Sequence, residues 1–265
     1  MDQPLYILSR GSTPLLIDVP HAGTHVPAEI AAGMTPLALT VPDTDWHVPS
    51  LYQHALERGA GLMAATHSRY VIDLNRDPQD VALYPGADNT ELCPRQSFAN
   101  EPLYRAGREP DAIAVRRRRE IGWAPYHAAL RAELERLRAE HGYAVLLDAH
   151  SIRSRVPRFF EGRLPDLNLG TADGRSCAAD LRERAMTVLR GAAGFSAVLD
   201  GRFKGGYITR HYGQPGEGVH ALQLEIAQAC YMDEERPRTW SPAPAMALVE
   251  VLRSLVEALL RWRPD

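Results

Sequence analysis

The stretch VLLDAHS, residues 145–151, joins a continuous apolar run to three polar side chains. Its first three residues have the pattern of a strand that is covered on both faces, as in a parallel sheet. Asp148, His150 and Ser151 then follow at the end of that run. Polar groups at the end of a buried strand cost free energy unless they have partners. The end of this strand is therefore predicted to contain residues of a functional site.

Apolar runs of this kind alternate with helical patterns along the chain. Strands are predicted at residues 14–19, 61–67, 143–149 and 219–226, and helices at 49–59, 114–142, 174–191 and 244–262. Pro125 lies inside the longest helical stretch and predicts a kink or a division into two helices. Residues 84–110 and 200–218 are predicted to be long loops, and glycines at 204–213 suggest that the second can move. The alternation indicates one α/β domain over residues 1–265.

Length and composition limit the possible functions. The 265 residues are 45% hydrophobic and 24% charged, with a net charge of −3, as expected of a soluble globular protein. This charge argues against nucleic acid or an anionic membrane as the main partner. The RRRR run at 116–119 is interleaved with acidic residues, so we interpret it as a solvated helix face.

The cysteines and the apolar runs indicate the compartment. Cys93, Cys177 and Cys230 are far apart, odd in number and without a CxxC spacing, so neither a disulfide framework nor a thiolate zinc site is indicated. The sequence has no signal-peptide pattern and no apolar run of about 18 residues. We expect a cytoplasmic protein that is a monomer or a small homo-oligomer.

His, Asp and Glu residues gather where the predicted strands end. They lie in VPHAGTHVP (19–27), PDTDWHVP (42–49), LLDAHS (146–151) and ALQLEIAQ (221–228). Because loops after parallel strands converge on one crevice, these side chains are expected to meet. A single histidine in a loop is more often a hydrogen-bonding residue, but several such sites together favour a metal. Imidazole and carboxylate without thiolate are the ligands of catalytic zinc.

Six motifs carry a resemblance to a known family: IDVPHAG, DTDWHVPSLY, SRYVIDLNRDP, LLDAHS, GGYITRHYGQP and ALQLEI, in this order between residues 10 and 235. Together they resemble the N-formylglutamate amidohydrolase family. The resemblance implies a three-layer αβα sandwich with a mixed, mostly parallel central sheet, of the phosphorylase/hydrolase type and similar to zinc exopeptidases. It also implies metal-dependent hydrolysis of N-formyl-L-glutamate to L-glutamate and formate in histidine degradation.

A more distant similarity to zinc carboxypeptidases implies the metal ligands. AHS at 149–151 resembles a ligand-histidine motif that follows a buried strand in those enzymes. Their first motif is HxxE, whereas Thr24 stands here where the glutamate would be, so the carboxylate must come from elsewhere. Asp148 is expected to orient a neighbouring ligand. The expected ligands of one divalent ion, Zn²⁺, are His21, His150 and, as the candidate carboxylate, Asp45, with His25 and His47 as alternatives.

The same similarity implies the remaining roles. Glu225 matches a catalytic glutamate on a late strand and would accept the proton of the attacking water. The substrate carries two carboxylates, which guanidinium groups bind well. DLNRD at 73–77 implies that Asn75 and Arg76 bind substrate. Further candidates beside the motifs are Arg69, Arg153 and Arg210 for substrate binding, one of which would instead stabilise the oxyanion. His211, beside Arg210, is a candidate for proton transfer or substrate binding.

Two other functions remain open from the sequence. The same scaffold could act on another N-acyl amino acid or as a carboxypeptidase. A non-catalytic protein could use its arginines to bind a dicarboxylate. Metal content separates the non-catalytic protein from the enzymes, and formate release from N-formylglutamate separates the first function from the second.

Overall fold

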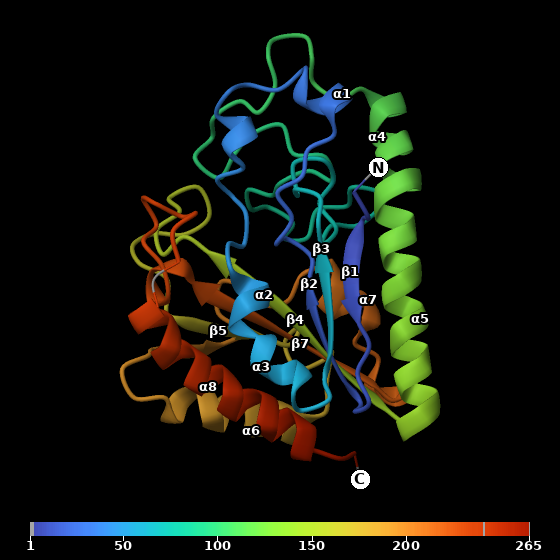
Figure 1. The fold of residues 1–265 in the computed structure, drawn as a ribbon, viewed down its shortest axis with the longest axis vertical. Helices are drawn as coiled ribbons and strands as arrows, with labels where there is room; N and C mark the ends of the chain where they lie inside the picture. The colour runs from blue at the N-terminus through green and yellow to red at the C-terminus, as the bar shows by residue number, and fades with distance from the viewer. Residues whose placement is uncertain (1–2, 241, 265) are drawn as a thin grey trace.

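The structure is a computed structural model that describes residues 3–240 and 242–264 (Figure 1). The strands are β1 Tyr6–Ser9, β2 Leu15–Val19, β3 Gly61–Ala65, β4 Ala144–Ile152, β5 Leu167–Gly170, β6 Ala197–Leu199 and β7 Val219–Ala227. The α-helices are α1 Ala28–Ala31, α2 Val48–Leu51, α3 Gln53–Leu56, α4 Ala112–Arg118, α5 Ala124–His141, α6 Ala179–Gly191, α7 Tyr207–Tyr212 and α8 Pro242–Arg261. A π-helical turn, η2 Arg119–Trp123, joins α4 to α5.

The strands of the described residues form one sheet in the order β1-β3-β2-β4-β7-β5-β6. The central strands β3, β2, β4 and β7 are parallel to one another. β1 is antiparallel to β3, and β5 is antiparallel to β7 but parallel to β6. The sheet is therefore mixed and mostly parallel, which confirms the fold class that the family resemblance implied.

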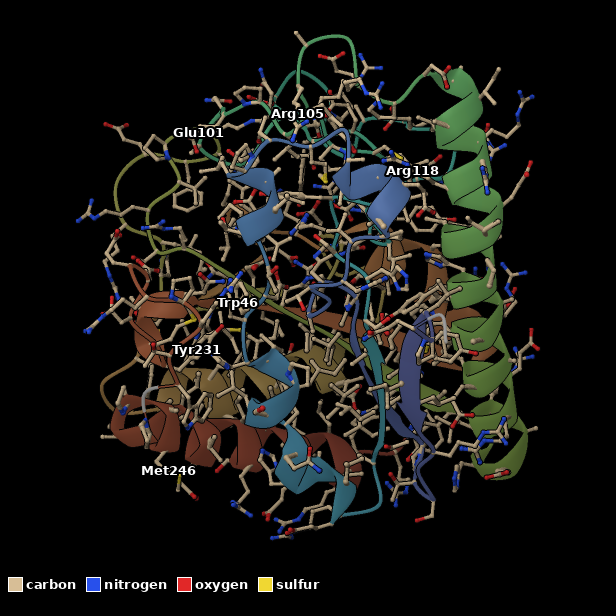
Figure 2. The ribbon with its side chains drawn as sticks, turned by 45° about the horizontal axis from the view of Figure 1, so that its top comes forward. Trp46, Glu101, Arg105, Arg118, Tyr231 and Met246 are labelled. Carbon is tan, nitrogen blue, oxygen red and sulfur yellow. The ribbon has the colours of Figure 1, made fainter. Side chains whose placement is uncertain are left out.

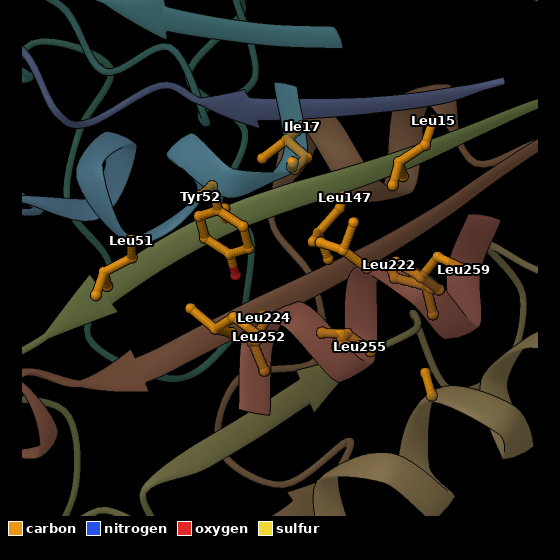
Figure 3. Close-up of a cluster of buried hydrophobic side chains, with 14 of the residues drawn as sticks. Leu15, Ile17, Leu51, Tyr52, Leu147, Leu222, Leu224, Leu252, Leu255 and Leu259 are labelled. Atoms are coloured by element: carbon orange, nitrogen blue, oxygen red, sulfur yellow. The ribbon is translucent and has the colours of Figure 1, made fainter. Parts of the chain in front are cut away.

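Helices cover both faces of the sheet, with α5 on one side and α6 and α8 on the other (Figure 1). Successive strand residues point to opposite faces. Leu147 and Leu222 belong to the buried cluster that includes Leu255 of α8 (Figure 3), whereas Leu146 packs in the cluster that includes Leu130 of α5. Each such leucine contributes about 1.5–3 kcal/mol on full burial. The continuous apolar pattern of β4 thus follows from a three-layer αβα sandwich.

The π-helical turn divides the long helix that the sequence predicted at 114–142. Pro125 has no backbone N–H and cannot donate the helical bond to residue 121, and the wider turn at Arg119–Trp123 precedes it. The indole Nε1 of Trp123 donates to the backbone oxygen of Arg76, 3.1 Å away. A π-helical turn often lies near a functional site, and here it supports a residue of the cavity described below.

The predicted loop at 200–218 was partly wrong, because Tyr207–Tyr212 forms α7. The glycines before it permit close packing. A Cβ on Gly206 would lie 2.3 Å from Asn75 Nδ2, and Gly205 has φ of +104°. Strands β1, β5 and β6 were missed because they are only three to four residues long. No described helix is both long and apolar enough to span a bilayer.

Candidate active site

A cavity opens at the carboxyl ends of the neighbouring strands β2, β4 and β7. His21 follows β2, His150 lies near the end of β4, and Glu225 lies near the end of β7. His150 and Glu225 are register partners across the two strands. The predicted meeting of His and Glu side chains from separate strand ends is thus confirmed for these three residues.

His21, Asp45 and His150 form a buried cluster on the cavity wall. One ligand atom from each side chain lies within 4.8 Å of the other two. His150 Nδ1 is 3.0 Å from Asp45 Oδ2, and His21 Nδ1 is 3.8 Å from the same oxygen. His21 Nδ1 is buried and has no hydrogen-bond partner among the described residues, which is costly unless another ligand satisfies it. The three side chains could hold a metal ion.

The other ring nitrogen of each histidine contacts a carboxylate. His21 Nε2 lies 2.7 Å from Asp73 Oδ1, and His150 Nε2 lies 2.7 Å from Asp148 Oδ1. Such carboxylates fix the ring and leave Nδ1 facing the metal position. Burial opposes ionisation of Asp73, but Arg69 and His21 hold its pKa well below the usual value. Asp148 contacts His150 as expected. Asp73 was not a predicted site residue, although it begins the DLNRD motif.

Asp45 is held in place by the end of β4. Its Oδ2 accepts a bond from the backbone N–H of Ser151, 3.1 Å away. The hydroxyl of Tyr231 lies 2.7 Å from the Trp46 carbonyl oxygen and 2.8 Å from Ser151 Oγ, and Figure 2 shows Trp46 and Tyr231 close together. Tyr231 therefore ties the segment that carries Asp45 to the strand that carries His150.

Asp45 and His150 stabilise each other's charged forms. Burial opposes both charges, but the contact with His150 lowers the pKa of Asp45, and the carboxylates of Asp148 and Asp45 raise the pKa of His150 well above its ordinary value. A cation that binds here must replace the proton that these two side chains share. Its affinity is therefore expected to fall as the pH is lowered.

The variant Asp148→Asn tests the carboxylate behind His150. Loss of the charge should weaken metal binding about 10- to 100-fold, the usual effect of removing such a partner. Competition with a chromophoric chelator measures the Kd of the metal. The matched control is Asp173→Asn, because Asp173 is an exposed partner of Lys204 and should leave the Kd unchanged. An unchanged Kd in Asp148→Asn would contradict this role.

Glu225 faces the cavity with few partners. Among the described residues its side chain contacts Gln223 Nε2, 3.5 Å from Oε2. Burial, together with the charge of Asp45, raises the pKa of Glu225 to about 8, against the opposing charges of His150 and Arg69. A buried carboxyl with a raised pKa beside a metal cluster is suited to proton transfer.

Two of the predicted arginines line the cavity. Arg69 Nη2 donates to Asp73 Oδ2 at 2.6 Å, and its Nη1 lies 3.9 Å from Asp45 Oδ1. Arg76 donates to the backbone oxygen of Asn75 and to the backbone and side-chain oxygens of Thr90. Within the described residues no ion pair neutralises Arg76, so its charge is available to an anionic ligand.

Asn75 also lines the cavity, but its amide contacts protein groups. Its Oδ1 accepts the backbone N–H of Ile208 at 2.8 Å, and its Nδ2 lies 2.9 Å from His150 Nε2. The structure therefore places Asn75 behind a metal-cluster histidine, and its predicted role in substrate binding stays a prediction.

Three predicted residues do not line the cavity, and their site roles stay predictions. Arg153 pairs with Glu235 at the surface. Arg210 donates Nε to the Gly205 backbone oxygen at 2.8 Å. His211 stacks on Tyr207 with ring centroids 4.9 Å apart and borders a separate surface groove. The structure does not bring them to the cavity, because closeness to a motif along the chain does not fix which way a side chain points.

The alternative ligands lie outside the metal cluster as well. His25 packs against His67 with ring centroids 4.7 Å apart, and His47 Nε2 lies 2.8 Å from the Pro237 backbone oxygen. Conversely, the cavity contains Tyr84 and Arg202, which were not among the predicted site residues. The feature of the sequence that could have indicated Tyr84 and Arg202 is their position in the two predicted long loops.

Comparisons with known proteins agree on one family. A family model described as N-formylglutamate amidohydrolase matches residues 13–232. A curated protein of Pseudomonas aeruginosa named N-formylglutamate deformylase is 51% identical over 99% of this chain and 98% of its own. One of Pseudomonas putida with the same name is 50% identical over 96% of this chain and 94% of its own.

A solved structure supports the same relationship. The crystal structure of N-formylglutamate amidohydrolase from Ralstonia eutropha JMP134 has a TM-score of 0.79 and 29% sequence identity to this chain. The match covers 97% of this chain and 96% of that one. The similarity thus extends over nearly the whole of both folds.

Proposed function

Because the chain belongs to the N-formylglutamate amidohydrolase family and hydrolyses N-formylglutamate, we propose that a divalent metal ion and Glu225 carry out this reaction. The observation that carries the proposal is the buried cluster of His21, Asp45 and His150, in which His21 Nδ1 has no partner among the described residues. Glu225 lies beside it on the next strand.

We assign the metal as Zn²⁺, held by His21, Asp45 and His150. Two imidazoles and one carboxylate are a common ligand set of catalytic zinc. When bound, such an ion polarises a carbonyl group and lowers the pKa of a water molecule to about 7. The carboxylates of Asp73 and Asp148, which contact Nε2 of each imidazole, would leave both Nδ1 atoms free to bind the ion.

Glu225 is assigned both proton transfers. A formamide is resonance-stabilised, so its hydrolysis needs an activated water and protonation of the leaving nitrogen. Glu225 accepts the proton of the water as the C–O bond forms, and donates it to nitrogen as the C–N bond breaks. Its raised pKa, about 8 through burial, suits a group that holds this proton between the two steps.

The arginines of the cavity are assigned to bind or stabilise negatively charged groups of the substrate. Arg69 lies beside Asp45 and is placed to stabilise charge that develops on the formyl oxygen. Arg76 has no ion-pair partner among the described residues and is assigned a substrate carboxylate, which a guanidinium binds through two parallel hydrogen bonds. The products are L-glutamate and formate.

Metal removal tests the proposal. Purified protein should contain about one equivalent of zinc and release formate from N-formyl-L-glutamate. Dialysis against a chelator should lower the rate by at least about 10²-fold, and added Zn²⁺ should restore it, because the ion supplies both carbonyl polarisation and an activated water. Full activity in protein shown to be metal-free would contradict the metal assignment. A protein that only binds dicarboxylates would release no formate.

We also place this reaction in the cytoplasm and in histidine degradation. The family resemblance of the sequence implies the pathway. The free thiols of Cys93, Cys177 and Cys230 are compatible with a reducing compartment.

A further inference from the structure

Arg202 is a cavity residue with an uncompensated charge. Its Nε donates to the backbone oxygen of Phe159 at 2.6 Å. Its guanidinium carbon lies 5.0 Å from the ring centroid of Tyr84 and 5.4 Å from that of Phe203. Within the described residues, neither of its Nη atoms has a hydrogen-bond partner and no carboxylate pairs with it. Aromatic rings position this half-buried cation, but they do not neutralise it.

The segment that carries Arg202 is fixed to the sheet. The carboxylate of Asp200 accepts bonds from the Thr171 backbone N–H at 2.6 Å and from its hydroxyl at 2.5 Å. Gly206 donates its N–H to Gln223 Oε1 of β7 at 2.6 Å. A Cβ on Gly170 of β5 would lie 2.5 Å from the Gly205 nitrogen. Arg202 is therefore held in place before any ligand binds, which lowers the entropic cost of binding.

Arg76 and Arg202 line the same cavity but have different neighbours. Arg76 follows Asn75, whose amide lies 2.9 Å from His150 of the metal cluster. Arg202 instead contacts the aromatic residues Phe159, Phe203 and Tyr84. These neighbours indicate that Arg76 is the cation nearer to the proposed reaction centre and that Arg202 is the cation farther from it.

The two carboxylates of N-formylglutamate also lie at different distances from the reacting formyl group. In N-formylglutamate the α-carboxylate sits on the carbon bonded to the reacting nitrogen, whereas the side-chain carboxylate lies two methylene groups farther away. A molecule with its formyl group at the metal cluster presents the near carboxylate to Arg76 and the far one toward Arg202. Resting on the proposed function, we propose that Arg202 determines specificity by binding the side-chain carboxylate of N-formylglutamate.

The ratio of kcat/KM for N-formyl-L-glutamate to that for N-formyl-L-glutamine tests this role. The glutamine compound has the same shape but lacks the side-chain charge, so it leaves Arg202 without a partner. In Arg202→Met this ratio should fall by about 10²-fold, because the loss affects only the charged substrate. Arg202→Lys should keep part of the ratio, since it retains a positive charge without the planar geometry.

Arg210→Met is the matched control. The guanidinium carbon of Arg210 also lies over the Tyr84 ring, 5.1 Å from its centroid, but Arg210 does not line the cavity. This variant should keep the wild-type ratio. If Arg202→Met lowered both substrates equally, or if Arg210→Met changed the ratio as strongly, the proposal would be overturned.

A binding measurement separates this proposal from the proposed function. Calorimetric titration with glutarate, a dicarboxylate that cannot react, should show at least about 10-fold weaker binding to Arg202→Met than to wild type. Thermal unfolding checks that both proteins are folded. If Arg202→Met does not fold, Arg202→Lys takes its place in the titration. Equal glutarate affinity would refute the role of Arg202. Loss of activity on chelation tests only the metal assignment. The ratio of kcat/KM for the two substrates and the affinity for glutarate test only the role of Arg202.

Discussion

His150→Ala is expected to abolish hydrolysis of N-formylglutamate and to reduce bound zinc far below one equivalent. His150 Nδ1 lies 3.0 Å from Asp45 Oδ2 in the metal cluster, and a catalytic zinc site depends on three protein ligands. The loss should exceed about 10³-fold in kcat/KM, since both carbonyl polarisation and the activated water depend on the ion. Elemental analysis after gel filtration and formate release measure the two effects.

His25→Ala is the control for this prediction. His25 packs against His67 outside the cluster and should keep both metal and activity. The substitution also removes the partner of Asp148 Oδ1. Thermal unfolding, together with the variant His150→Gln, which keeps a polar side chain, shows whether the fold survives. Retention of one equivalent of metal by folded His150→Ala would remove His150 from the ligand set.

The sequence predicted the long central strands well, because their signals are local. β2, β3, β4 and β7 are apolar runs, and their polar ends converge through the geometry of any parallel sheet. His21 and His150 could therefore be proposed as neighbours before their distance was known. β5 and β6 have three to four residues each, and their position in the sheet depends on pairing with distant segments, which no local pattern encodes.

The sequence could not predict the direction in which the side chains of the candidate residues point. Arg210 and His211 were chosen because they lie in a motif, but α7 turns a different residue toward the site. Thr209 Oγ1 donates to Asp148 Oδ2 at 2.8 Å, and Asp148 in turn contacts His150. Before the helix was known, its 3.6-residue period could not be applied to this segment. Arg202 was missed for a similar reason, since a loop has no period to indicate its inward side.

Glu225→Gln is expected to lower kcat by at least about 10²-fold while the bound metal is retained. Glutamine keeps the size of the side chain but cannot accept the proton of the attacking water. The side chain of Glu225 is buried and contacts Gln223 at 3.5 Å, so the substitution should fit without repacking. KM should change little, because the lost interaction belongs to the proton transfer in the transition state.

The pH profile and a surface control make this prediction specific. If Glu225 must be ionised to accept the proton, wild-type kcat/KM falls at low pH as Glu225 is protonated, and the residual activity of Glu225→Gln should lack that dependence. Glu183→Gln is the control, because Glu183 is largely exposed beside Arg182. Loss of the metal together with activity would instead make Glu225 a ligand, and the carboxylate of Asp45 would then no longer be needed to complete the site.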